Sequence, residues 1–166
     1  MDQLNSLHLT PGTYFMNNIK SKIQYHIKNR KKWFKFRKIK FIISSTDIPG
    51  EGEIKIIKKI KKISKINKKD KHLIIGNDAD LIVISMSCIY AHNIFVMLKN
   101  KYENIIISID KLINSFCNLI KSKKKINIKK LRTDFAIVSI MNGNDYLPKL
   151  QYVNNNILWN SYIKIK

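Results

Sequence analysis

Residues 51–86 read EGEIKIIKKIKKISKINKKDKHLIIGNDADLIVISM, and this stretch predicts a helix, a strand and a second helix. Over residues 51–67, isoleucines recur at helical spacing, at positions 56, 57, 60, 63 and 66. Residues 72–76 form a short apolar run typical of a buried strand. Residues 81–86 favour a short helix, although their β-branched side chains leave a strand open. The stretch is therefore typical of an α/β protein.

The rest of the chain continues this alternation. We expect further helices at residues 14–31, 110–121 and 131–141, and further strands at residues 38–45, 94–98 and 104–108. Alternating elements predict an α/β fold with a central, mostly parallel sheet flanked by helices. Binding sites in such sheets lie at the carboxyl ends of the strands.

Composition restricts the class of protein. The chain has 166 residues, 45% of them apolar, which fits one domain with a hydrophobic core. No apolar run reaches the roughly 20 residues that a membrane helix needs, so we expect no membrane partner. Residues 1–10 lack the pattern of a signal peptide. Neither Cys88 nor Cys117 belongs to a CxxC pair, which favours a reduced, intracellular protein without a zinc knuckle. We expect the protein in the cytoplasm in preference to the nucleus.

The formal net charge of +21 predicts attraction to a polyanion such as nucleic acid. Almost all basic residues are lysine, however, and the coding bias of an A/T-rich genome explains that composition equally well. The lysines of the helix at residues 51–67 could guide a nucleic-acid strand, but a solvated helix face is the simpler interpretation. Aromatic and basic residues alternate over residues 33–37; they could stack bases, but we expect the aromatic rings in the core.

The acidic residues are concentrated. Only eleven exist, and three short segments hold five of them: Glu51, Glu53, Asp78, Asp80 and Asp145. Taken singly, each segment has a structural explanation. The two glutamates follow a Pro-Gly turn and open a helix, where acids favour the helix dipole. The Asp78 segment can cap the next helix, and Asp145 lies in a Gly-Asn-Asp turn.

Together the three segments favour a metal site. Carboxylate oxygens are the ligands that Mg²⁺ prefers, and this many acids could surround two ions roughly 4 Å apart. Without cations, five converging carboxylates would repel one another strongly. We therefore expect two Mg²⁺ ions, with Mn²⁺ as the alternative. The sequence does not itself show that the segments converge.

Four blocks of the chain resemble the Xrn-type 5′→3′ exoribonucleases. The blocks lie in the family's order at residues 5–16, 48–56, 72–82 and 134–148. The second contains Pro-Gly-Glu-Gly-Glu, the third Asp-Ala-Asp-Leu, and the fourth Gly-Asn-Asp-Tyr-Leu-Pro. The resemblance implies that residues 1–166 are part of an N-terminal nuclease domain with a fold like the PIN and flap nucleases.

The resemblance also implies catalytic residues that are Mg²⁺ ligands, namely Glu51, Glu53, Asp78, Asp80 and Asp145. The ions would activate water and stabilise the leaving 3′ oxygen, releasing mononucleotides from single-stranded, 5′-monophosphorylated RNA. In the family, the first strand, two more acidic ligands and a basic 5′-phosphate pocket precede the segment that residues 1–15 match. We therefore expect a fold and site incomplete at the N-terminus. A split gene, a decayed gene fragment, or a complementing chain as partner would each account for this.

The chain departs from the family at two smaller positions, because Ile54 and Lys149 stand where the family has histidine. Two other functions stay open beside the exoribonuclease. One is a non-catalytic nucleic-acid-binding remnant of such an enzyme, and the other is a flap-type 5′ nuclease acting on DNA. The Pro-Gly-Glu-Gly-Glu and Gly-Asn-Asp-Tyr-Leu-Pro blocks favour the Xrn type over the flap type.

Overall fold

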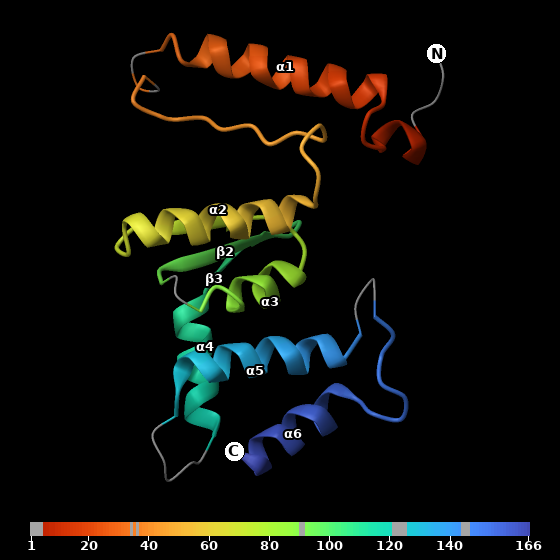
Figure 1. Ribbon diagram of the computed structural model, residues 1–166, viewed down its shortest axis with the longest axis vertical. Coiled ribbons are helices and arrows are strands. Elements are labelled where there is room, and N and C mark those ends of the chain that lie inside the picture. Colours follow the sequence, from red (N-terminus) through yellow and green to blue (C-terminus); the bar gives the residue numbers. More distant parts are fainter. Residues whose placement is uncertain (1–4, 34, 36, 90–91, 121–125, 144–146) are drawn as a thin grey trace. The chain divides into compact units, whose positions relative to one another are not determined.

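The computed structural model describes residues 5–33, 35, 37–89, 92–120, 126–143 and 147–166 (Figure 1). The chain divides into two compact units, Met1–Gly52 and Glu53–Lys166. In the part of the chain that is described, no helix is both long enough and apolar enough to cross a membrane. Cys88 and Cys117 are both free thiols.

The first unit consists of a 3-10 turn, η1 (Ser6–Leu9), and one long helix, α1 (Tyr14–Arg30). The hydroxyl of Thr13 caps α1 by accepting a hydrogen bond from the N–H of Met16. The helix predicted at residues 14–31 is thereby confirmed. The expectation of buried aromatic rings is wrong for Trp33, which is 51% exposed and has the Arg30 guanidinium 4.4 Å from its ring centre. Phe34 and Phe36 lie outside the described residues.

The strand predicted at residues 38–45 is also wrong, because these residues form neither a helix nor a strand. Ile39 and Ile42 are 44% and 60% exposed. A strand needs a partner for its backbone N–H and C=O groups. The described residues of the first unit contain no other strand that could provide those hydrogen bonds.

The described residues of the second unit form eight elements, the first of which, α2, begins at Gly52, one residue before the unit. They are α2 (Gly52–Ile66), β1 (His72–Ile75), α3 (Asp80–Met86), β2 (Ile94–Lys99), β3 (Asn104–Ser108), α4 (Ile109–Leu119), α5 (Ile128–Met141) and α6 (Asn155–Ile165). All but α6 were predicted from the sequence to within a few residues, and residues 81–86 are helical.

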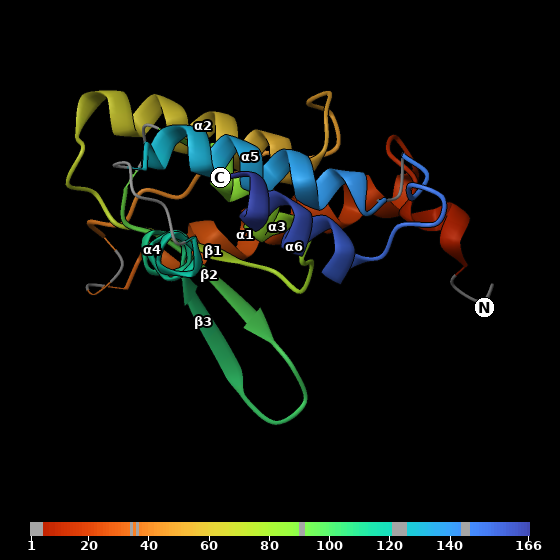
Figure 2. The ribbon, with the colours of Figure 1, turned by 90° about the horizontal axis from the view of Figure 1, so that it is seen from below.

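The sheet has three strands in the order β1-β2-β3 and is mixed. Strand β1 runs parallel to β2, whereas β2 and β3 form an antiparallel hairpin (Figure 2). The expectation of a mostly parallel sheet is therefore corrected. The reason is the short connection at residues 100–103, where the Asn100 side chain accepts hydrogen bonds from the N–H groups of Tyr102 and Glu103. Parallel neighbours need a crossover of a dozen or more residues.

The core lies on one face of this sheet. Helix α2 contributes Ile57 and Ile60, and the strands contribute Ile74, Ile94 and Val96, all at most 6% exposed. On β1 only one face is buried, because Leu73 and Ile75 are 54% and 63% exposed. The run at residues 72–76 is therefore a half-buried strand instead of a fully buried one.

Helix α5 is fastened to the end of α3 by a buried arginine. The guanidinium of Arg132 is 1% exposed and donates to the carbonyl oxygens of Ser85 and Met86, at 3.0 and 3.2 Å. It also lies 3.9 Å from the Asp110 carboxylate. The last carbonyls of a helix have no partner within it, and Arg132 provides a donor for the Met86 carbonyl. The Ser85 carbonyl also accepts from the N–H of Cys88 at 3.1 Å, so Arg132 adds a second donor there.

Candidate active site

The loop after β1 is held at the carboxyl end of the strand by its neighbour β2. The N–H of Gly76 donates to the Met97 carbonyl at 3.1 Å, and the Asn77 side-chain oxygen accepts from the Lys99 N–H at 2.9 Å. A Cβ atom on residue 76 would lie 2.5 Å from Cδ1 of the buried Leu81, so a larger residue there would displace the Leu81 side chain. Hydrogen bonds to β2 therefore hold Gly76 and Asn77, the first residues of the loop that carries Asp78 and Asp80.

Asp78 and Asp80 lie together in this loop. Oδ1 of Asp78 accepts a hydrogen bond of 2.8 Å from the N–H of Asp80, the first residue of α3. Asp78 is exposed and Asp80 is half-buried. The aspartate pair thus supports the start of a helix, as the structural interpretation expects. A carboxylate has two oxygens, however, and this amide occupies only one of those on Asp78.

Glu53 lies in the first turn of α2 and is half-buried. Helix α2 and strand β1 are joined by a short turn, so they run in opposite directions. The start of α2 and the loop after β1 therefore lie at the same end of the second unit (Figure 1). Glu51 belongs to the first unit, and is preceded by Gly50 with a φ of 99° that favours glycine.

Asp145 lies outside the described residues, but both ends of its loop are described. Gly143 follows α5 with a φ of 88°, and a Cβ atom there would lie 2.9 Å from the backbone nitrogen of Lys149. The N–H of Leu150 donates to the Met141 carbonyl at 3.4 Å. The described residues on either side of Asp145 therefore both lie at the carboxyl end of α5.

The carboxyl end of α5 and the loop that carries Asp78 and Asp80 both line a pocket of about 570 Å³. Its wall includes Ala79, the residue between the two aspartates, together with Ser139 and Asn142 of α5 and its C-cap. The side-chain oxygen of Asn142 is buried and has no hydrogen-bond partner within the described part of the chain. A buried acceptor without a donor costs about 1–3 kcal/mol, so this position suits an additional donor or a cation.

Among the described residues, no group of three or more His, Cys, Asp or Glu side chains is close enough to hold a metal ion. Of the five predicted ligands, the structure brings Asp78 and Asp80 together, and the first turn of α2, which holds Glu53, lies at the same end of the unit. Their carboxylate chemistry fits Mg²⁺. With Glu51 in the other unit and Asp145 not described, the complete site stays a prediction.

Sequence reasoning missed two features of the unit that carries this site. The first is Arg132, whose burial against α3 cannot be recognised from a single basic position. The second is helix α6, whose aromatic residues pack with Phe116 of α4 and Phe135 of α5. Its signal was present, because Leu158, Trp159, Tyr162 and Ile163 have helical spacing after the N-cap Asn154.

Comparison with known proteins identifies the family. The profile described as XRN 5′-3′ exonuclease N-terminus matches residues 1–101, more than half of the chain. The chain belongs to this family. The 5′-3′ exoribonuclease 1 of Saccharomyces cerevisiae is 29% identical over an alignment that covers 93% of the chain. The human 5′-3′ exoribonuclease 1 is 24% identical over 95% of the chain, and the Drosophila melanogaster 5′-3′ exoribonuclease 2 homolog 33% over 52%.

The resemblance to the XRN family stated from four sequence blocks is therefore confirmed. The profile match includes the positions of Glu51, Glu53, Asp78 and Asp80. The yeast and human alignments leave 7% and 5% of the chain uncovered, too little to end before residue 145. The chain spans 12%, 11% and 10% of the lengths of the yeast, human and fly relatives.

Proposed function

We propose that the protein is part of a metal-dependent 5′→3′ exoribonuclease acting on single-stranded RNA with a 5′ monophosphate. The observation that carries the proposal is the pair Asp78 and Asp80, held after β1 within the segment that matches the XRN profile. The relatives named above are 5′-3′ exoribonucleases, which supports RNA as the substrate.

We propose that Glu51, Glu53, Asp78, Asp80 and Asp145 bind two Mg²⁺ ions, with Mn²⁺ as a substitute. When bound, the ions would supply an activated water and would stabilise the leaving 3′ oxygen. The loop after β1 would hold the two aspartates in place, because Asn77 and Gly76 tie it to β2. The side-chain oxygen of Asn142, which has no hydrogen-bond partner among the described residues, adds an acceptor beside Ala79 that suits a cation-bound water.

We place the remaining ligands outside these 166 residues, in the same polypeptide or in a complementing chain, and the enzyme inside the cell. The net charge of +21 supports an RNA substrate, since each lysine that neutralises a phosphate releases a bound counterion.

The test is a time course with purified protein and 5′-monophosphorylated, single-stranded RNA, in Mg²⁺ or in chelator. We expect mononucleotides in Mg²⁺ only, and faster loss of the 5′-monophosphate than of the 5′-hydroxyl RNA. A complementing N-terminal segment of a relative, added in trans, tests whether ligands outside these residues limit the rate. RNA that stays intact in every mixture, with folded protein, would contradict the proposal.

The second candidate is a non-catalytic RNA-binding protein of the same family. It is favoured by the observation that the described residues hold no group of three metal-ligating side chains, while the charge remains strongly positive. RNA binding that survives chelation, without cleavage in Mg²⁺ with or without the added segment, would establish this function instead.

A further inference from the structure

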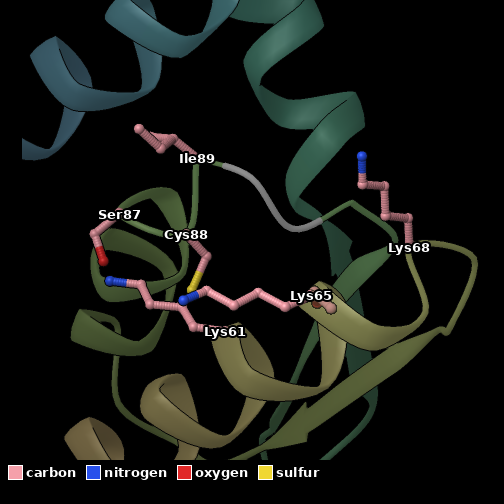
Figure 3. A pocket seen from close by; sticks show the side chains of 7 residues that line it. Lys61, Lys65, Lys68, Ser87, Cys88 and Ile89 are labelled. Atoms are coloured by element: carbon pink, nitrogen blue, oxygen red, sulfur yellow. The ribbon is translucent and has the colours of Figure 1, made fainter.

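A second cavity, of about 600 Å³, lies beside the C-terminal half of α2 (Figure 3). Lys61 and Lys65 from α2 and Lys68 from the following turn line one part of it. Ser87, Cys88 and Ile89, which follow α3, line another part. The volume lies within the roughly 300–1,000 Å³ of sites for small molecules.

This cavity is distinct from the acidic loop. Glu53 lies in the first turn of α2, and Lys61 and Lys65 lie near the end of the same helix. At a rise of 1.5 Å per residue, the two lysines are about 12–18 Å from Glu53 along the helix axis. A ligand in the cavity would therefore leave the proposed metal ligands free.

One wall of the cavity is apolar. Cys88 is 1% exposed, and its burial raises the pKa of the thiol, which stays neutral at physiological pH. Ile89 continues this wall, and the methylene stems of the lysines add further apolar surface. Such a wall suits the flat, weakly polar face of a ligand.

The ammonium groups of two lysines, Lys61 and Lys65, lie at one side of that apolar wall. Lys61 and Lys65 are one turn apart on the same face of α2. Figure 3 shows the Lys61 ammonium group toward Ser87 and the Lys65 ammonium group toward Cys88, with Lys68 farther away. The charge of Lys61 acts on the Cys88 thiol, which agrees with this proximity.

Within the described ranges, none of these three lysines forms an ion pair with a carboxylate. Like charges one helical turn apart repel each other, so a bound anion between Lys61 and Lys65 would relieve that repulsion. A phosphate offers several acceptor oxygens to two ammonium groups at once.

We propose that this cavity binds a nucleoside phosphate, with the phosphate between Lys61 and Lys65 and the base against Ile89, beside the buried Cys88. Inorganic phosphate alone would leave the apolar wall unused, and an uncharged apolar ligand would leave the lysines unused. The nucleoside phosphate could be a free mononucleotide or one unit of an RNA strand. The site does not require the acidic residues or RNA cleavage.

The experiment titrates the whole chain, in chelator and about 0.15 M salt, with adenosine 5′-monophosphate, adenosine, inorganic phosphate and single-stranded oligoadenylate. Calorimetry gives the affinities, and backbone NMR shifts locate the site. We expect the mononucleotide to shift the amide signals of Ser87, Cys88 and Ile89. Adenosine and phosphate should each bind about 10-fold more weakly or worse, since each lacks half of the contacts.

The matched variants are Lys61→Gln with Lys65→Gln, and Lys58→Gln with Lys59→Gln as control. All four lysines are exposed on α2, so each pair removes the same charge from the same helix, but only the first pair lines the cavity. We expect the first pair to weaken ligand binding about 10-fold or more, and the control pair about twofold or less. Ser87→Trp, which fills the cavity without a change of charge, should weaken binding as the first pair does.

If the Lys61 and Lys65 variant loses affinity for adenosine 5′-monophosphate and the control pair does not, a free nucleotide is sufficient for binding. If the same variant loses affinity for oligoadenylate alone, the bound nucleoside phosphate is one unit of an RNA strand. Equal losses for the two lysine pairs, or none for either, would overturn the proposal, because binding would then follow overall charge. Because the titrations contain chelator, their outcome is independent of whether the protein cleaves RNA in Mg²⁺.

Discussion

The side-chain oxygen of Asn77 accepts a 2.9 Å hydrogen bond from the backbone N–H of Lys99. This bond joins the loop that carries Asp78 and Asp80 to the last residue of β2. It extends the β1–β2 pairing past the end of β1, so a side chain continues the backbone ladder. The position of the acidic loop therefore depends on a residue that is not itself acidic.

The first prediction concerns this bond. Asn77→Ala should lower the free energy of unfolding by about 1 kcal/mol, the usual net contribution of one hydrogen bond. Urea unfolding measures the change. The control is Asn118→Ala on the exposed side of α4, where a change below about 0.5 kcal/mol is expected. Equal effects at both positions would show that the bond to Lys99 does not stabilise the loop.

The second prediction concerns Arg132. Arg132→Met should destabilise the second unit by about 3 kcal/mol, because the buried Met86 carbonyl loses its side-chain donor and the Asp110 carboxylate loses a nearby cation. The Ser85 carbonyl loses one donor but keeps the N–H of Cys88. The midpoint of urea unfolding measures the loss. Lys130→Met, on the exposed surface of α5, should change the midpoint little. A stable Arg132→Met protein would mean that packing alone holds α5 against α3.

The third prediction separates metal binding from RNA binding. Asp78→Asn with Asp80→Asn keeps an acceptor for the Asp80 N–H but removes two negative charges. Cleavage in Mg²⁺ should fall about 100-fold or more, whereas RNA binding in chelator should stay within about twofold. Asp70→Asn with Glu103→Gln removes the same charge outside the three acidic segments and should leave cleavage unchanged. Unchanged cleavage in the first variant would exclude these aspartates from the site.

The fourth prediction concerns pH. Burial acts to raise the pKa of Asp134, but hydrogen bonds from Lys166 and Tyr162 outweigh it and lower the pKa below its ordinary value of 3.8. A carboxyl group with a lowered folded-state pKa stabilises the protein above its unfolded pKa and loses that contribution as pH falls through the folded value.

Asp134→Asn should therefore cost stability at pH 5–7, and the difference from the unchanged protein should shrink below about pH 4. Urea unfolding over a pH series measures it. Asp70→Asn, which lies outside this cluster, is the control for a general loss of negative charge. A difference that is constant from pH 7 to pH 3 would show that the pairing with Lys166 and Tyr162 contributes no charge-dependent stability.

Local periodicity determined most of the helices and strands of this protein. The isoleucine spacing of α2 reflects burial of one helix face, and the apolar run of β1 is typical of a strand, although the structure leaves Leu73 and Ile75 exposed. Both patterns can be recognised from residues that are neighbours in the chain. The same reasoning failed at residues 38–45, because an apolar run is a strand only when another strand provides its hydrogen bonds.

The sequence by itself determined the acidic blocks, their order, and the family to which they belong. Only the tertiary structure decided that β2 and β3 form a hairpin, that Asn142 lies by a pocket shared with Ala79, and that Arg132 caps α3. The physical reason is the separation along the chain of the residues that interact. Side-chain periodicity follows from local backbone geometry, whereas these contacts depend on packing between segments far apart in the chain, which burial and hydrogen-bond satisfaction decide together.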